Sequence, residues 1–350
     1  MKPPLRSWLL APLHVAALAT GAKSFRDNPV IGSPGLNRLG LHVGRMQVAA
    51  AMSARRRRRL RGLVSSHDRE DFERDGFILK PNFLPPEVFE TLRSEALSFH
   101  APAREMIQGD VVTRRIALDR ALMTRQPHLA RLLDDPAWLN PIRYVGTSRL
   151  APLTYIQTIF SQVRPGAIDP QAELHADTFH SSVKAWLFLT DVGADDGAFC
   201  YVPGSHRLTA QRLAWERRNS ITARDHPVFV AARGSPRIRA DELPALGLPP
   251  AKVFAVAANT LVVADTMGFH ARGLSNRPTV RAEVWAFGRR NPFLPWTGLH
   301  LLSAPVLRER PVSLLWSGLD AAERIGLRRN PWRDAGIMAP TDPTSAAERS

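Results

Sequence analysis

Two histidines and an aspartate lie within six positions of the sequence, in the segment ELHADTFH at residues 173–180. His175 and Asp177 are separated by one residue and are expected at the end of a strand, where their side chains share a face. A His-X-Asp pair alone is common in solvated turns, and the second histidine, His180, could be a surface residue or a substrate contact. The pair indicates a metal site only if a third ligand comes from elsewhere in the chain.

A third candidate ligand, His270, follows the apolar run TLVVADTMGF. Two neutral imidazoles and one carboxylate on one face of Fe(II) leave three positions open, enough for a bidentate oxoacid and O₂. Arg281 comes eleven residues after His270, at the start of another expected strand. Its planar guanidinium could pair with the far carboxylate of the oxoacid. The spacing therefore predicts an iron site of His175, Asp177 and His270 with Arg281 beside it.

The elements expected to hold these residues are mainly strands. Short apolar runs separated by Pro and Gly turns are typical of an antiparallel sandwich or jelly roll. After residue 150 such runs are LTYIQTIFSQV, SVKAWLFLTDV, AFCYVPG, KVFAVAANTLVVAD (two short strands) and VRAEVWAFG.

Helices are expected ahead of this strand-rich part. A serine cap and the Gly76 stop predict a helix in SHDREDFERDGF, and a second begins at PPEVFETL. We expect residues 101–150 to be mainly helical, with candidates in PHLARLLDD and PAWLNPIRYV, and residues 207–250 to be an insertion with helical and Pro-rich parts. Residues after about 339 are expected to be loose.

Basic charge is concentrated at the N-terminus. Residues 1–66 hold twelve lysines and arginines against one acid, Asp27, so +11 of the net charge of +15 lies there. The apolar stretch at residues 8–22 is too short to span a bilayer comfortably. An amphipathic helix on a membrane or on the protein body, packing within the arm, and a cleaved signal all remain open. No zinc-finger or helix-turn-helix pattern accompanies the arginines, which argues against a nucleic-acid partner.

From about residue 68 to about residue 290 the sequence resembles the phytanoyl-CoA dioxygenase family of Fe(II)- and 2-oxoglutarate-dependent oxygenases. The motifs that carry the resemblance are FERDGFILKPNFLPPEVFETL, HAD, VKAWLFLTDVGADDGAFCYVPGSHR and FHARGLSNRPTVR. The resemblance implies a mainly β fold with flanking helices, a double-stranded β-helix or jelly roll. It also implies roles for six residues: His175, Asp177 and His270 as iron ligands, Arg281 for the C5 carboxylate of 2-oxoglutarate, Trp186 beside this cosubstrate, and Gln157 on the strand that faces cosubstrate and substrate.

We therefore expect three parts: a basic, partly apolar arm at 1–66, a helical layer with the oxygenase jelly roll at 67–300, and a C-terminal extension at 301–350. The resemblance implies a dioxygenase that uses Fe(II), 2-oxoglutarate and O₂, hydroxylates a C–H bond of a small or lipid-like metabolite, and releases succinate and CO₂. Asp177 stands where halogenating relatives carry a small residue, which favours hydroxylation. We expect a cytoplasmic protein, peripheral to an anionic membrane through its arm. The alternative is a non-catalytic metal- or ligand-binding jelly roll whose arm binds a membrane or a partner.

Overall fold

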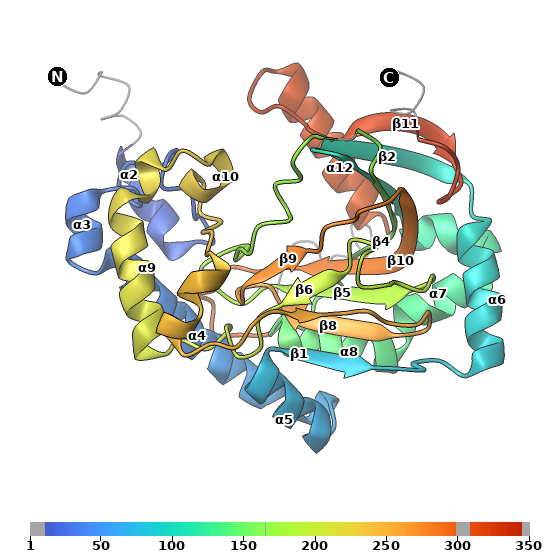
Figure 1. The fold of residues 1–350 in the computed structure, drawn as a ribbon, viewed down its shortest axis with the longest axis horizontal. Helices are drawn as coiled ribbons and strands as arrows, with labels where there is room; N and C mark the ends of the chain where they lie inside the picture. Colours follow the sequence, from blue (N-terminus) through green and yellow to red (C-terminus); the bar gives the residue numbers. More distant parts are fainter. Residues whose placement is uncertain (1–10, 165, 299–308, 345–350) are drawn as a thin grey trace.

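The computed structural model describes residues 11–164, 166–298 and 309–344. Its centre is an eight-stranded sheet in the order β1-β8-β5-β10-β4-β3-β2-β11, and a smaller sheet has the order β7-β6-β9 (Figure 1). All recorded pairings within these sheets are antiparallel, and helices flank them, so the predicted fold class is confirmed. The strands are β1 (Phe77–Lys80), β2 (Ala101–Gln108), β3 (Val111–Ala117), β4 (Leu153–Ser161), β5 (Val183–Phe188), β6 (Phe199–Tyr201), β7 (Lys252–Val253), β8 (Leu261–Asp265), β9 (His270–Arg272), β10 (Thr279–Gly288) and β11 (Arg333–Met338).

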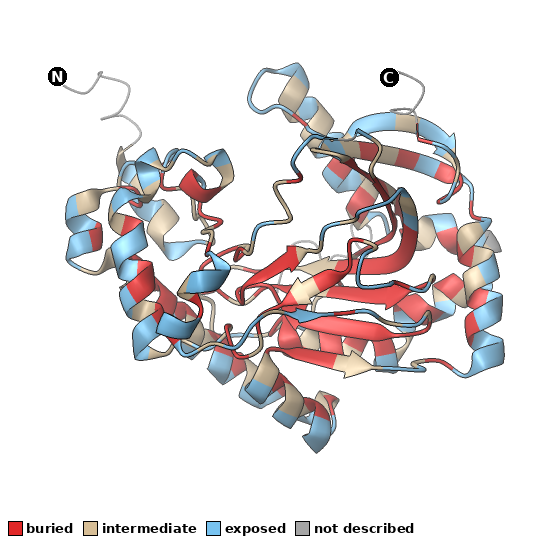
Figure 2. Ribbon diagram, viewed as in Figure 1, coloured by how far each residue is buried: buried red, intermediate tan, exposed pale blue. Residues whose placement is uncertain are grey.

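Aromatic side chains join the two sheets. The rings of Trp186 on β5 and Phe199 on β6 have centroids 4.3 Å apart, and Phe77 on β1 meets Tyr201 on β6 edge to face at 5.6 Å. All four side chains are buried, and the strands form the most continuously buried part of the ribbon (Figure 2). This double layer carries His270 on β9, and the loop that contains His175 and Asp177 pairs with it at His270.

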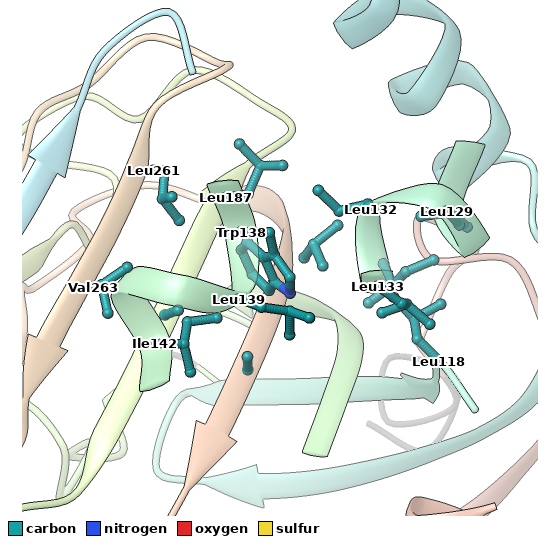
Figure 3. Close-up of a cluster of buried hydrophobic side chains, with 14 of the residues drawn as sticks. Leu118, Leu129, Leu132, Leu133, Trp138, Leu139, Ile142, Leu187, Leu261 and Val263 are labelled. Carbon is teal, nitrogen blue, oxygen red and sulfur yellow. The ribbon is translucent and has the colours of Figure 1, made fainter. Parts of the chain in front are cut away.

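The outer face of the large sheet is covered by helices. Trp138 and Ile142 of one helix lie against Leu187 of β5 and Val263 of β8, in a cluster of buried aliphatic side chains (Figure 3). Apolar residues at helical spacing place this stripe against the sheet. Helices N-terminal to β4 that contribute to this core are α5 (Ser66–Asp75), α6 (Pro86–Leu97), α7 (Pro127–Asp134), α8 (Pro136–Val145) and, through Leu60, the end of α4 (Leu41–Leu60).

The prediction that residues 101–150 are mainly helical is wrong for the hairpin β2–β3. Ala101, Ala103 and Glu105 of β2 are buried while the residues between them are more exposed, a strand alternation. Charged residues obscured this pattern because two of them are buried as a pair, with Arg114 Nη2 2.6 Å from Glu105 Oε1. The helices expected further along this segment are present as α7 and α8.

The C-terminal segment adds helix α12 (Pro311–Arg324) and strand β11, which extends the large sheet beside β2. The expectation that the chain is loose after about residue 339 is wrong for 339–344. The guanidinium of Arg114 donates to the carbonyl oxygens of Ala339 (2.9 Å), Asp342 (2.7 Å) and Pro343 (2.8 Å). Residues 345–350 lie outside the described part.

The N-terminal helices and the insertion lie side by side at one end of the sheets (Figure 1). The helices of the first segment are α2 (Ala11–Ala16), α3 (Pro34–Arg38) and α4 (Leu41–Leu60), and those of the second are α9 (Ala210–Thr222) and α10 (Phe229–Ala232). Among the described residues, no helix is both long and apolar enough to cross a bilayer.

A buried polar cluster joins α4 to α9. His42 Nε2 lies 3.1 Å from Glu216 Oε2, and Arg212 Nε donates to Glu216 Oε1 at 2.9 Å. Burial by itself would raise the pKa of Glu216, but the Arg212 guanidinium and the bond to His42 outweigh it, so the pKa lies below its ordinary value. The carboxylate is therefore part of the contact between the two helices.

Arg56 connects α4 to the body of the protein. Its side chain is 1% exposed and donates hydrogen bonds to Thr147 Oγ1 (3.1 Å), to the Pro292 carbonyl (3.0 Å), to Ser53 Oγ (3.1 Å) and to the Leu294 carbonyl. The basic run Arg55–Arg59 thus contains a buried arginine whose three guanidinium nitrogens all donate hydrogen bonds. The predicted boundary at residue 66, between the N-terminal arm and the oxygenase part of the chain, stays a prediction.

Candidate active site

The structure brings His175, Asp177 and His270 together. One potential ligand atom from each lies within 4.8 Å of the others, and Asp177 Oδ1 is 3.9 Å from His175 Nε2 and 3.7 Å from His270 Nε2. His180, the second histidine of the opening motif, is 1% exposed and does not belong to this group.

Backbone pairing sets the geometry of the two histidines. His175 and His270 form an isolated antiparallel bridge, with N–H···O distances of 2.9 Å in both directions. The expectation that His175 and Asp177 end a strand is wrong: they lie in a bridged loop, and Asp177 N–H donates to the Thr266 carbonyl at 2.9 Å. His270 begins its own strand, β9, after a tight turn. At Gly268 in this turn a Cβ would lie 1.9 Å from Tyr201 Oη, so only glycine fits.

The ring nitrogens that face the group are available for a metal. Nδ1 of His175 lies 2.7 Å from the Glu173 carbonyl, and Nδ1 of His270 lies 3.0 Å from the Gly268 carbonyl. A carbonyl only accepts, so each Nδ1 carries the proton and each Nε2 has a free lone pair. His270 Nε2 is buried without a hydrogen-bond partner among the described residues, as expected for an atom that binds a metal.

The charges of the group suit Fe(II). Burial lowers the pKa of His270 to about 4 and that of His175 well below its ordinary value, so both rings are neutral at neutral pH. Burial would raise the pKa of Asp177, but Lys184, followed by the two imidazoles, holds it well below its usual range. Lys184 Nζ is 2.6 Å from Asp177 Oδ2, which leaves Oδ1 turned toward the histidines. Two neutral nitrogens and one carboxylate oxygen are the donor set of a facial iron triad.

A cavity of about 220 Å³ opens beside this triad and contains the other three predicted residues. Arg281 on β10 is 5% exposed, donates from Nε to Glu283 Oε2 at 3.0 Å, and donates from Nη1 to the Gly197 carbonyl. Trp186 forms part of the wall together with Phe199.

Gln157 lies between two charged groups. Its Nε2 donates to Glu283 Oε1 at 2.8 Å, and its Oε1 accepts from Arg115 Nε at 2.9 Å. Glu283 thus links Gln157 to Arg281 and fixes the direction of both side chains. Both polar atoms of the carboxamide thus have a partner, which fixes its orientation in the cavity wall.

Sequence reasoning missed several cations at the site. Arg115 lines the cavity and stacks over the ring of Trp285 at 3.9 Å, and Arg272 lines it while paired with Asp169 at 3.0 Å. Arg115 belongs to the hairpin that was expected to be helical, so no local pattern pointed to it. Lys23, from the N-terminal arm, donates from Nζ to the backbone carbonyl of Asp177. Only the folded chain shows these neighbours.

About half of the chain is similar in sequence to a known protein family. The family model described as phytanoyl-CoA dioxygenase (PhyH) matches residues 72–241. Over these residues, just under half of the chain, the sequence is similar to the PhyH family. The match includes His175 and Asp177, whereas His270 and Arg281 come after it, on β9 and β10.

A curated relative is the ectoine dioxygenase of Halomonas elongata, 29% identical over 161 residues, which are 42% of this chain and 47% of that protein. The chain thus spans about half the length of the curated relative it matches. Among solved structures, the epimerase SnoN from nogalamycin biosynthesis is similar with 18% identity and a TM-score of 0.42, covering 63% of this chain and 81% of that one. HygX from Streptomyces hygroscopicus, with nickel and 2-oxoglutarate bound, has 19% identity and a TM-score of 0.41, with 65% and 87% covered.

Proposed function

We propose that this PhyH-family chain is an oxygenase that depends on Fe(II) and 2-oxoglutarate and hydroxylates a C–H bond of a small molecule. The observation that carries the proposal is the buried group of His175, Asp177 and His270 beside a cavity lined by Arg281. When bound, iron and 2-oxoglutarate would together supply the activation of O₂, and 2-oxoglutarate would leave as succinate and CO₂.

The chain's own residues orient these groups. The Glu173 and Gly268 carbonyls hold the protons of the two rings, so both Nε2 atoms face the metal position. Lys184 holds Asp177 Oδ2 and leaves Oδ1 as the third ligand. Because Asp177 fills this position with a carboxylate, hydroxylation is favoured over halide transfer.

Arg281 is placed to orient the cosubstrate. Its guanidinium is held by Glu283 and Gly197 and lines the cavity that also contains the triad, so it would pair with the C5 carboxylate of 2-oxoglutarate. Trp186 and Phe199 form an aromatic wall of the same cavity and exclude water from it.

The test is the turnover of 2-oxoglutarate by the full chain loaded with Fe(II). Succinate should form slowly without substrate and faster with the correct small molecule from a metabolite panel, and omission of iron should stop it. If the chain binds Fe(II) and 2-oxoglutarate but forms no succinate with any of a broad panel, the non-catalytic binding protein is the better description.

We propose membrane-surface attachment as a separate property of the arm. It is supported by the exposed apolar residues Leu13 and Val15 of α2 and by the exposed Arg55, Arg58 and Arg59 of α4. An apolar segment and a basic cluster are the two weak signals that stable surface binding requires, and salt screens the second. Flotation of the full chain with anionic liposomes at low salt, lost at high salt, is the expected result. Equal flotation with neutral liposomes would contradict it.

A further inference from the structure

A second cavity opens from His175 and Asp177 toward the N-terminal arm. Its volume is about 640 Å³, and it shares Gln171, His175 and Asp177 with the cavity that contains Arg281 and Trp186. Its walls come from the arm, from the insertion around α10, from the segment after β10 and from the chain that follows α12. The cationic side chains in these walls are Lys23, Arg233, Arg237, Arg289 and Arg328.

The acids of this cavity do not balance the cations. Asp27 pairs with Arg233 at 2.7 Å, and the side chain of Asp177 is directed to the triad and to Lys184. Within the described part of the chain, no other Asp or Glu lines the cavity. An excess of positive charge therefore faces the open side of the metal position.

Within the described ranges, the guanidinium of Arg237 lacks hydrogen-bond acceptors for two of its nitrogens. Its side chain is 9% exposed, and its Nε and Nη1 atoms are buried without a hydrogen-bond partner among the described residues. The nearest acid recorded for it, Glu173, is 3.7 Å away and 58% exposed, so it does not satisfy these nitrogens. A buried guanidinium with unmet donors is costly unless an acceptor occupies the cavity.

Contacts with helix α4 and with the insertion fix the backbone of the N-terminal arm around Lys23. Arg45 on α4 donates to the carbonyls of Thr20 (3.0 Å) and Ala22 (2.8 Å), just ahead of Lys23. On the other side, Gly234 has φ +83°, and a Cβ there would lie 2.2 Å from the Lys23 carbonyl oxygen. The insertion and the arm are thus in close backbone contact beside the cavity.

We propose that this cavity is the substrate site and that the substrate carries an oxyanion, a carboxylate or a phosphate, held by Lys23, Arg237 and Arg289. The proposal rests on the proposed oxygenase function in one respect: the remainder of the substrate reaches the triad, where His175 and Asp177 close the cavity. The cosubstrate's own carboxylate has a separate partner, Arg281, in the other cavity. The cationic side chains of the cavity beside the arm are therefore available to bind the substrate.

The test measures anion binding, without turnover. The full chain, loaded with Mn(II) and 2-oxoglutarate, is titrated calorimetrically with inorganic phosphate and, separately, with acetate at constant ionic strength. We expect Lys23→Met and Arg289→Met each to weaken binding of the preferred anion at least about tenfold, since each removes a charge-assisted hydrogen bond. Arg131→Met, which removes the same charge from an exposed position on α7, should bind as wild type does.

The outcomes separate the two proposals. Preference for phosphate indicates a phosphate ester as substrate, and preference for acetate indicates a carboxylic acid. Unchanged affinity in both Lys23→Met and Arg289→Met, or no binding of either anion to wild type, overturns the anion site. Failure of the oxygenase proposal is seen independently, as a wild-type chain that does not bind 2-oxoglutarate, because the anion titration can be repeated on the metal-free chain.

Discussion

Substitution of Arg56 by methionine tests whether helix α4 belongs to the folded body of the protein. The change keeps an apolar stem and removes a guanidinium that donates to Thr147 and to the carbonyls of Pro292 and Leu294. Two backbone carbonyls then lose a charged donor, and an unsatisfied buried group costs about 1–3 kcal/mol. Removing the guanidinium also removes the free-energy cost of burying its charge, which offsets part of this loss of stability. That cost is visible in the pKa of Arg56, which burial lowers to about 10.

Two unsatisfied carbonyls would together cost about 2–6 kcal/mol. Because of the offset, we expect Arg56→Met to lower the free energy of unfolding by about 2–3 kcal/mol, the lower part of this range. Urea unfolding followed by tryptophan fluorescence measures it as a shift in midpoint at constant slope. Arg58→Met, on the same helix but exposed, is the matched control and should change stability by less than about 0.5 kcal/mol. Equal midpoints for the two variants would show that α4 is a separate arm and that the packing described for Arg56 does not hold in solution.

Three further predictions concern the triad, the cosubstrate and pH. His175→Ala, Asp177→Ala and His270→Ala should each lose most bound Fe(II) and most 2-oxoglutarate turnover, measured by metal analysis and succinate release; full turnover in Asp177→Ala would exclude it as a ligand. Arg281→Lys should keep iron but bind 2-oxoglutarate about 10- to 100-fold more weakly, since a point charge replaces a two-pronged contact, and equal affinity would assign the carboxylate to another arginine. Folding lowers the pKa of Glu216, so its contribution to stability is present above the ordinary carboxyl value of about 4.3 and is lost as the pH falls through the folded pKa. The stability difference between wild type and Glu216→Gln should therefore narrow between pH 7 and pH 3 in urea unfolding, and a constant difference would refute the linkage.

The sequence is most informative where a motif and a strand coincide. The runs that contain Gln157 and Trp186 are strands, and the spacing of His175, Asp177 and His270 was sufficient to predict a group that the structure brings within bonding distance of one metal. Apolar alternation and turn residues determine such elements locally, so they are readable without tertiary information.

The errors arise where buried charge replaces apolar alternation. In the hairpin β2–β3, Arg114 and Glu105 are buried as a pair, and Arg115 is held by Gln157 of β4. A polar strand of this kind resembles a helix in composition. Lys23 was missed for a related reason. Its neighbourhood in sequence is a basic arm, and only the contact with the insertion near Gly234 brings it to the Asp177 backbone.

The position of these charges also explains why the family indicates a reaction class and leaves the substrate open. The PhyH match at residues 72–241 includes His175 and Asp177, and the fold adds His270 and Arg281 from the strands that follow. Lys23 and Arg289 lie outside the match, and the cavity they share exists only where the arm and the end of β10 meet the insertion. If His175, Asp177, His270 and Arg281 hold iron and cosubstrate as proposed, substrate choice depends on such added segments, since they can change without disturbing these four residues.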